Sequence, residues 1–181
     1  MPNTNFTHHF LVAMPSLQGT DFERAVIYLC EHDENGAMGL MINKPMDLKL
    51  GNILRHLEIK VGTEDAEHHP VLMGGPVGQE HGFIIHPENF FQPLTDIAVS
   101  SSKKMLESIA EGSGPADFII TLGYSGWESG QLEEELNDND WLIVPFDRNV
   151  LFNIPLEHRW QEAALLAGIN IHQLSGHVGH A

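Results

Sequence analysis

The sequence predicts a single α+β domain, residues 1–181, with a mixed or antiparallel sheet and helices around it. The chain has 181 residues, a length that suits one hydrophobic core. Hairpin patterns are mixed with helical patterns, and strands and helices do not alternate regularly. Hydrophobic residues make up 42% of the chain and charged residues 19%, which is typical of a globular protein. This order of elements disfavours the alternative, a doubly wound nucleotide-binding fold.

The N-terminal part begins with a hairpin. Residues 25–31 and 37–42 have apolar strand patterns, and the Asp33-Glu34-Asn35-Gly36 segment between them has the composition of a turn. The spacing of the next apolar residues predicts a short amphipathic helix that begins near Asp47 and ends at Leu57, with its apolar face toward the core.

The remaining elements are predicted from short apolar strand patterns, from the helical spacing of apolar residues and from glycines that end helices. We expect a polar loop at 64–69, and two short strands at 70–73 and 82–86 that form a second hairpin or a bulged ribbon. Further along the chain we expect a helix at 102–111, a strand at 117–122, a helix at 130–136, a strand at 141–144 and a helix at 155–167 that stops at Gly168.

The charge balance disfavours direct binding to nucleic acid. Nine Lys and Arg stand against 25 Asp and Glu, a formal net charge of -16. Phosphate contacts from Lys and Arg supply most non-specific nucleic-acid affinity, so direct nucleic-acid binding is disfavoured. A basic recognition helix is also missing, because Arg55 is the only fixed positive charge between Leu50 and Leu57.

The sequence has no membrane span or secretory signal and contains a single cysteine. No apolar run approaches the roughly 18 residues of a membrane span, and the N-terminus lacks the Lys or Arg of a secretory signal. We therefore expect a cytoplasmic protein that does not enter a membrane. Cys30 is the only cysteine, and its place in a strand pattern predicts a buried structural thiol.

The most unusual segment is residues 122–136, where we expect a glycine-rich aromatic turn between an apolar strand and a helix opened by carboxylates. Its glycines permit positive φ angles and the close approach of another chain or a ligand. Trp127 either packs the helix entrance or lines a pocket. Ser125 has a glycine directly after it, which does not fit a nucleophile elbow, so we interpret it as a turn or cap hydroxyl.

Three other motifs have both a structural and a chemical interpretation. The Gly74-Gly75-Pro76 segment is interpreted as a tight turn and not as an anion site, because no phosphate-loop Lys follows and Pro76 lacks an N–H. Glu31, His32 and Asp33 suit acid–base chemistry if they converge, but neighbouring strand residues alternate between faces. The Glu133–Glu135 run complements a helix dipole.

The chain has twelve histidines, which are possible metal ligands. None of the histidine pairs has the spacing of a known zinc module, so we predict no metal and no cofactor. The pairs are His8 with His9, His68 with His69, and His177 with His180.

Seven short segments, in a fixed order along the chain, carry a family resemblance. They are Phe10-Leu11-Val12-Ala13-Met14-Pro15, Glu31-His32-Asp33, Gly36-Ala37-Met38-Gly39-Leu40, Ile42-Asn43-Lys44-Pro45, Gly74-Gly75-Pro76-Val77, Gly123-Tyr124-Ser125-Gly126-Trp127 and Gly130-Gln131-Leu132-Glu133. Together they resemble the AlgH/YqgE family of bacterial proteins, from Phe10 to the C-terminus. The resemblance implies a compact α+β domain with a curved sheet, partly rolled like a barrel. It implies no reaction, and a regulatory label comes from a member linked to exopolysaccharide gene expression.

We therefore predict a binding or regulatory protein whose partner is a protein or a small molecule, with an indirect influence on gene expression as one form of this role. The alternatives are an enzyme that acts on a small substrate, such as an anion, at the glycine-rich strand ends, and a direct transcription factor, which the charge disfavours. Loops at strand ends commonly carry binding residues, so we expect the candidate residues to gather in one surface region. They are Glu31, His32, Asp33, Asn43, Lys44, Gly74, Gly75, Pro76, Tyr124, Ser125, Trp127 and Gln131.

Overall fold

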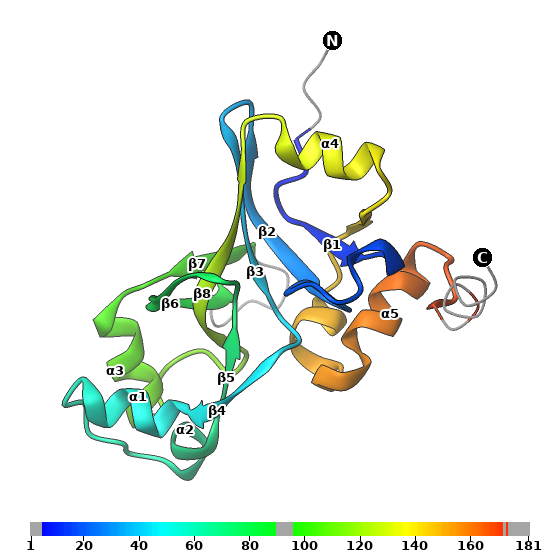
Figure 1. Cartoon of the computed structure of the whole chain (residues 1–181). Coiled ribbons are helices and arrows are strands. Elements are labelled where there is room, and N and C mark those ends of the chain that lie inside the picture. The colour runs from blue at the N-terminus through cyan, green and yellow to red at the C-terminus, as the bar shows by residue number, and fades with distance from the viewer. Residues whose placement is uncertain (1–4, 90–95, 172, 174–181) are drawn as a thin grey trace.

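A computed structural model of the chain describes residues 5–89, 96–171 and 173. Nine strands in these residues form one sheet (Figure 1). They are β1 (His9–Ala13), β2 (Val26–Asp33), β3 (Gly36–Met41), β4 (Pro45–Lys49), β5 (Pro70–Met73), β6 (Val77–Pro87), β7 (Ile97–Ser100), β8 (Ile119–Glu128) and β9 (Trp141–Pro145).

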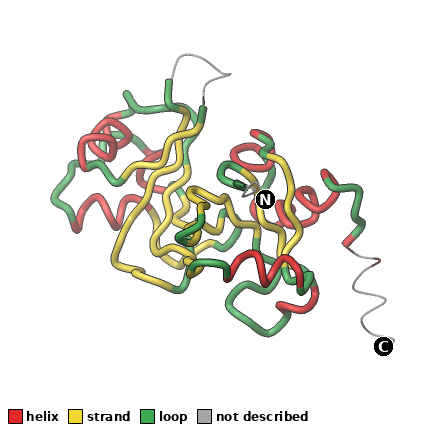
Figure 2. Tube along the Cα trace, turned by 90° about the horizontal axis from the view of Figure 1, so that it is seen from above, coloured by secondary structure: helices red, strands yellow, loops and turns green. Residues whose placement is uncertain are grey.

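Helices lie on the outside of this sheet, as the view from above shows (Figure 2). The α-helices of the described residues are α1 (Leu50–His56), α2 (Glu64–His68), α3 (Lys103–Glu111), α4 (Gln131–Asn137) and α5 (Arg159–Leu166). Short 3-10 or π segments are η1 (Pro15–Leu17), η2 (Asn149–Asn153) and η3 (Leu156–His158).

The sheet confirms the predicted α+β class and its mixed pairing. Its order is β4-β5-β8-β3-β2-β1-β9, and β6 pairs with both β8 and β7 off this path. Strands β5 and β8 run parallel, whereas β2 and β3 form the predicted antiparallel hairpin. In the described residues the sheet is not closed into a complete barrel.

Three predicted elements in the first half of the chain differ from the structure. Asp47 lies in strand β4, and α1 begins only at Leu50, because residues 45–49 alternate in exposure like a strand before the helical spacing takes over. The predicted loop at 64–69 contains helix α2, whose first turn is capped by the Thr63 hydroxyl, which accepts the Ala66 N–H at 3.0 Å. Strands β5 and β6 do not form a hairpin, since each pairs with β8.

The predicted glycine-rich turn at 123–127 is also wrong, because these residues continue strand β8. Gly123 has a φ of +80°, a conformation that favours glycine. At this residue β8 changes neighbours: Ile120 pairs with β5 and β6, whereas Ser125 pairs with β3. A glycine pattern that resembles a turn therefore marks a bend within one long strand.

The second half of the chain confirms the predicted helices. Helix α3 has Ser102 as its N-cap residue and ends at Gly112 in the left-handed conformation. Helix α4 starts after Gly130, as expected. The predicted helix at 155–167 is divided into η3 and α5, and Gly168 follows it with a φ of +77°.

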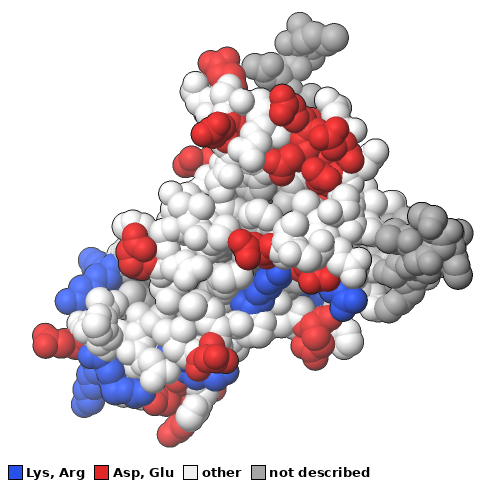
Figure 3. All heavy atoms as spheres, in the orientation of Figure 1, with Lys and Arg blue, Asp and Glu red and all other residues white. Residues whose placement is uncertain are grey.

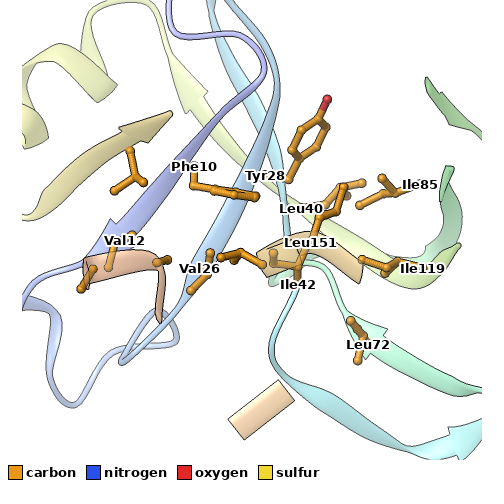
Figure 4. Close-up of a cluster of buried hydrophobic side chains, with 14 of the residues drawn as sticks. Phe10, Val12, Val26, Tyr28, Leu40, Ile42, Leu72, Ile85, Ile119 and Leu151 are labelled. Atoms are coloured by element: carbon orange, nitrogen blue, oxygen red, sulfur yellow. The ribbon is translucent and has the colours of Figure 1, made fainter. Parts of the chain in front are cut away.

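The core divides along the two faces of the sheet. Phe10 and Val12 of β1 point into the cluster under α5, which Figure 4 shows in close-up. Leu11, between them, points to the opposite face, into a cluster with Leu132 of α4. A third cluster lies between β5, β6 and β8 and the helices α1 to α3. This alternation is the period of two that a sheet buried on both faces requires.

Candidate functional site

The structure does not bring the candidate residues into one surface region. Glu31, His32 and Asp33 lie at the tip of the β2–β3 hairpin, where Asp33 pairs with Gly36. Asn43 and Lys44 follow the opposite end of β3. The remaining candidates lie along β8, at its junction with α4, or where β8 meets the segment that links β5 to β6. We expected a single cluster because all of these residues were assigned to strand ends, and β8 instead continues through its glycines.

At the hairpin tip, His32 is buried with both ring nitrogens bonded. The Phe6 backbone N–H donates to His32 Nδ1 at 3.0 Å, so His32 Nε2 carries the proton and donates to Glu133 Oε1 at 2.6 Å. This hydrogen bond lowers the pKa of Glu133. Glu31 and Asp33 are exposed while His32 is 4% exposed, as strand alternation predicts. His32 therefore joins the N-terminal segment to α4 and is not free to act as a base.

Trp127 is packed into the core and does not form an exposed rim. Its exposure is 7%, so of the two interpretations left open by the sequence, packing near the helix entrance is the one the structure shows. Its Nε1–H donates to Glu135 Oε1 at 3.1 Å, and Trp141 donates to the same oxygen at 3.0 Å. Gln131 accepts the Glu128 N–H at 2.9 Å and closes the entrance to α4. From the sequence we predicted only a helix-dipole role for Glu133 and Glu135, and we missed these partners.

The glycine-rich candidates form a close backbone crossing. A Cβ atom on Gly74 would overlap the Gly123 carbonyl, and one on Gly75 would overlap Tyr124. The buried Ser125 hydroxyl donates to the Gly74 carbonyl at 3.2 Å. Pro76 is exposed beside this crossing. The backbone of β8 thus occupies the space that an anion would need next to these glycines.

The last two candidates lie at the other end of β3. Asn43 accepts the Val26 N–H at 2.9 Å and donates to the Arg24 carbonyl at 2.8 Å, so its amide binds the backbone where β2 begins. Lys44 donates to the Asp21 carbonyl at 2.9 Å, and partial burial lowers its pKa.

A groove that the sequence did not predict lies between α1, α3 and the β6–β8 part of the sheet. We call it the α1–β6 groove; its volume is about 620 Å³. Ile84 and Ile120, which are 2% and 3% exposed, belong to its floor, and Leu57, at 38% exposure, stands on its rim. The lining residues are Leu48, Asn52, Ile53, His56, Leu57, Gln79, Glu80, Gly82, Phe83, Ile84, Ser101, Leu106, Ile120 and Leu122.

Among the described residues that line the α1–β6 groove there is no Lys or Arg, and Glu80 is the only carboxylate. Polar side chains, including Asn52, Gln79 and Ser101, are exposed, whereas the deeper residues are aliphatic or aromatic. The apolar spacing of α1 could have indicated this groove. We assigned the whole apolar face of the helix to the core, but Ile53 and Leu57 of that face line the groove.

Charge is distributed unevenly over the molecule. In the view of Figure 3, acidic side chains gather at the upper end, where α4 and the hairpin tip lie, and basic ones are concentrated near α1 and α3. Within the described residues, no group of three or more His, Cys, Asp or Glu side chains is placed to hold a metal ion. His177 and His180 lie outside those residues. No helix in the described part of the chain is long and apolar enough to cross a membrane.

This chain is an α+β protein with an open mixed sheet, in which the backbone of β8 packs closely against Gly74 and Gly75. The chain belongs to the AlgH-like family, whose model matches residues 10–172. It is 54% identical to a UPF0301 protein of Coxiella burnetii over the full length of both chains. It is 44% identical to the UPF0301 protein YqgE of Escherichia coli, over 98% of this chain and all of that one.

Solved structures agree with this assignment. The solution structure of the AlgH protein from Pseudomonas aeruginosa is 42% identical, with a TM-score of 0.78 over 97% of this chain and 95% of that one. A crystal structure of a Corynebacterium diphtheriae protein is 21% identical, with a TM-score of 0.69 over 90% of this chain and 87% of that one, and shows the shared fold alone.

Proposed function

We propose that this protein acts by binding, and that its ligand is a small, largely apolar molecule held in the α1–β6 groove. The observation that carries the proposal is the groove itself: about 620 Å³ of concave space with an apolar floor and a polar rim. Sites for small molecules commonly have this volume and this division between apolar walls and a few polar groups. The rim groups would orient a hydroxyl, amide or similar end of the ligand.

The other candidate positions support binding over catalysis. His32 has both nitrogens engaged, and the glycine crossing is filled by β8. Burial raises the pKa of the Cys30 thiol to about 12, which keeps it in the poorly nucleophilic form. A regulatory role would then operate through ligand occupancy or a protein partner, so an influence on gene expression would be indirect.

The proposal can be tested with a series of linear alcohols, using methyl NMR and calorimetry. We expect 1-octanol to shift the methyl resonances of Ile53, Leu57 and Leu106, which line the groove. Each added CH₂ contributes up to about 0.8 kcal/mol when buried, so 1-octanol should bind roughly tenfold more tightly than 1-hexanol. Octanoate and octylamine then show which charge the polar rim accepts.

Matched surface leucines provide the control. Leu57→Gln combined with Ile53→Gln should weaken octanol binding about tenfold by removing apolar contact area. Leu166→Gln changes a leucine that is 47% exposed on α5, outside the groove, and should leave affinity unchanged. Equal shifts at Leu57 and Leu166, or equal losses in both variants, would contradict the proposal.

A further inference from the structure

A second cavity of about 620 Å³ lies on the other side of Phe83 and Ser101, which line both this cavity and the α1–β6 groove. We call it the His8 cavity. Its chemistry differs from that of the groove because ionisable and hydroxyl side chains share its wall with apolar ones. The lining residues are Thr7, His8, Tyr28, Cys30, Glu31, Met38, Phe83, Asp96, Ile97, Val99, Ser100 and Ser101.

Two irregularities of the backbone meet at the His8 cavity. His8, just before β1, has a φ of +69°, which costs energy in a residue other than glycine. The β2–β3 ladder shifts register between Leu29 and Glu31. Such a bulge places an extra residue in the strand and redirects side chains, and here the consecutive residues Cys30 and Glu31 both line the cavity. Irregularities of these kinds concentrate at binding sites.

The His8 ring is held in one orientation. It stacks on Phe146 with ring centroids 4.3 Å apart, and its Nδ1 lies 2.6 Å from the Tyr28 hydroxyl. Burial lowers the pKa of His8 and raises that of Tyr28, so both groups are neutral near neutral pH. The structure shows no hydrogen bond to His8 Nε2 from the described residues, which leaves one imidazole nitrogen for a ligand.

The fixed charges on the His8 cavity are both negative. Glu31 and Asp96 are exposed carboxylates on its wall, and none of the described residues that line it is a Lys or Arg. Asp96 is close enough to oppose the effect of burial on His8. No three metal-binding side chains converge in the described residues, so the lining offers no ready site for a metal ion. Two carboxylates on one cavity, with Met38, Ile97 and Val99 along the same wall, instead match the chemistry of a cation with two ammonium groups and a hydrocarbon spacer.

We propose that the His8 cavity binds a short aliphatic diamine. Each ammonium group would contact one of the carboxylates of Glu31 and Asp96, and the hydrocarbon spacer would lie along the apolar wall, which Phe83 also lines. This second site is independent of the ligand proposed for the α1–β6 groove.

The test compares probes of equal length and different charge by calorimetry and amide NMR. The probes are 1,4-diaminobutane, 1,4-butanediol and butanedioate. We expect only the diamine to bind, with an affinity that falls as salt is added, and with shifts centred on His8, Tyr28 and Val99. Binding of the diol with equal affinity would overturn the proposal, as would stoichiometric Ca²⁺ or Zn²⁺ binding at the same residues.

Variants separate binding from folding. Asp96→Asn with Glu31→Gln should weaken diamine binding at least about tenfold, because two charge-assisted contacts are removed. His8→Gly removes the ring but suits the positive φ, so it should reduce affinity in a chain that stays folded. Glu34→Gln changes an exposed carboxylate on the same hairpin that does not line the cavity, and should have no effect. Unchanged affinity in the double variant would refute the proposal.

Discussion

At the scale of single residues, Glu135 has the largest unexpected role. One of its carboxylate oxygens accepts hydrogen bonds from the indoles of Trp127 and Trp141, which are 7% and 3% exposed. A buried donor that loses its acceptor costs about 1–3 kcal/mol. The half-buried Glu135 of α4 therefore holds two core aromatics in place.

Glu135→Ala should lower the free energy of unfolding by about 2–4 kcal/mol, since two indole N–H groups lose their partner. Glu135→Gln keeps an acceptor oxygen and should recover most of this loss. Urea denaturation followed by tryptophan fluorescence measures both. Glu134→Ala, at an exposed neighbour, should change stability by less than about 0.5 kcal/mol, and an equal loss there would contradict the assigned role.

His69 makes the stability depend on pH. Burial lowers the pKa of His69 from 6.5 to about 4, and its ring stacks on Phe118 at 4.1 Å. Between these two values the unfolded chain binds more protons than the folded one, so stability rises with pH and is complete above 6.5. At about 1.36 kcal/mol for each pKa unit, acidification toward pH 4 should remove up to about 3 kcal/mol.

Urea denaturation at a series of pH values tests this slope. His69→Leu should flatten the dependence between the two pKa values, with a small remainder from His8, whose pKa is also lowered by burial. His68→Gln, at the exposed neighbouring position, should keep the full slope. A His69→Leu variant with the same pH dependence as the original chain would show that other groups cause it.

At the scale of elements, strand β8 holds the two parts of the sheet together. It pairs with β5 and most of β6 before Gly123, with Val77 of β6 at Tyr124, and with β3 from Ser125 onward. A Cβ at Gly123 would lie 2.5 Å from the Gly75 carbonyl oxygen, and the residue has a positive φ. The bend therefore depends on glycine for both its conformation and its packing.

Gly123→Ala should reduce the free energy of unfolding by about 3 kcal/mol or more, as the sum of backbone strain and overpacking. Gly126→Ala is the matched control, three residues along the same strand, where an added Cβ would meet only Tyr124 at 3.7 Å. That change should be nearly neutral. Thermal unfolding of the two variants compares them directly, and similar melting temperatures would refute the role assigned to the bend.

Many of the helices and strands could be predicted from the sequence because turn residues and helix caps lie next to the elements they define. The β2–β3 hairpin follows from its turn residues, and α3 follows from Ser102 and Gly112. The course of β8 could not be predicted in this way, because glycine at 123 serves a contact with Gly75, 48 positions away in the sequence, and resembles a turn when read locally. The α1–β6 groove was missed for the same reason, since residues from four separate stretches of sequence, 48–57, 79–84, 101–106 and 120–122, line it.

At the scale of the whole molecule, the arrangement of charge argues against a nucleic-acid surface. Several of the nine Lys and Arg residues already have partners inside the protein: Arg55 bonds Glu67, Arg148 bonds Asp117, and the buried Arg159 donates to the Ile42 and Ile154 carbonyls. The basic side chains near α1 and α3 lie among carboxylates, and the opposite end is acidic (Figure 3).

We therefore expect no retardation of a random DNA duplex, even at about 50 mM salt, where phosphate contacts are strong. A duplex-binding protein releases counterions in proportion to its phosphate contacts, so its affinity would fall steeply with salt. The matched variant replaces Lys49, Lys60, Lys103 and Lys104, exposed lysines of the α1–α3 end, with glutamine. Salt-sensitive retardation by the original chain that this variant abolishes would refute the prediction and place a nucleic-acid surface on that end of the molecule. Equal absence of retardation in both proteins is the expected result, because a net charge of -16 repels the duplex before any local basic patch can reach it.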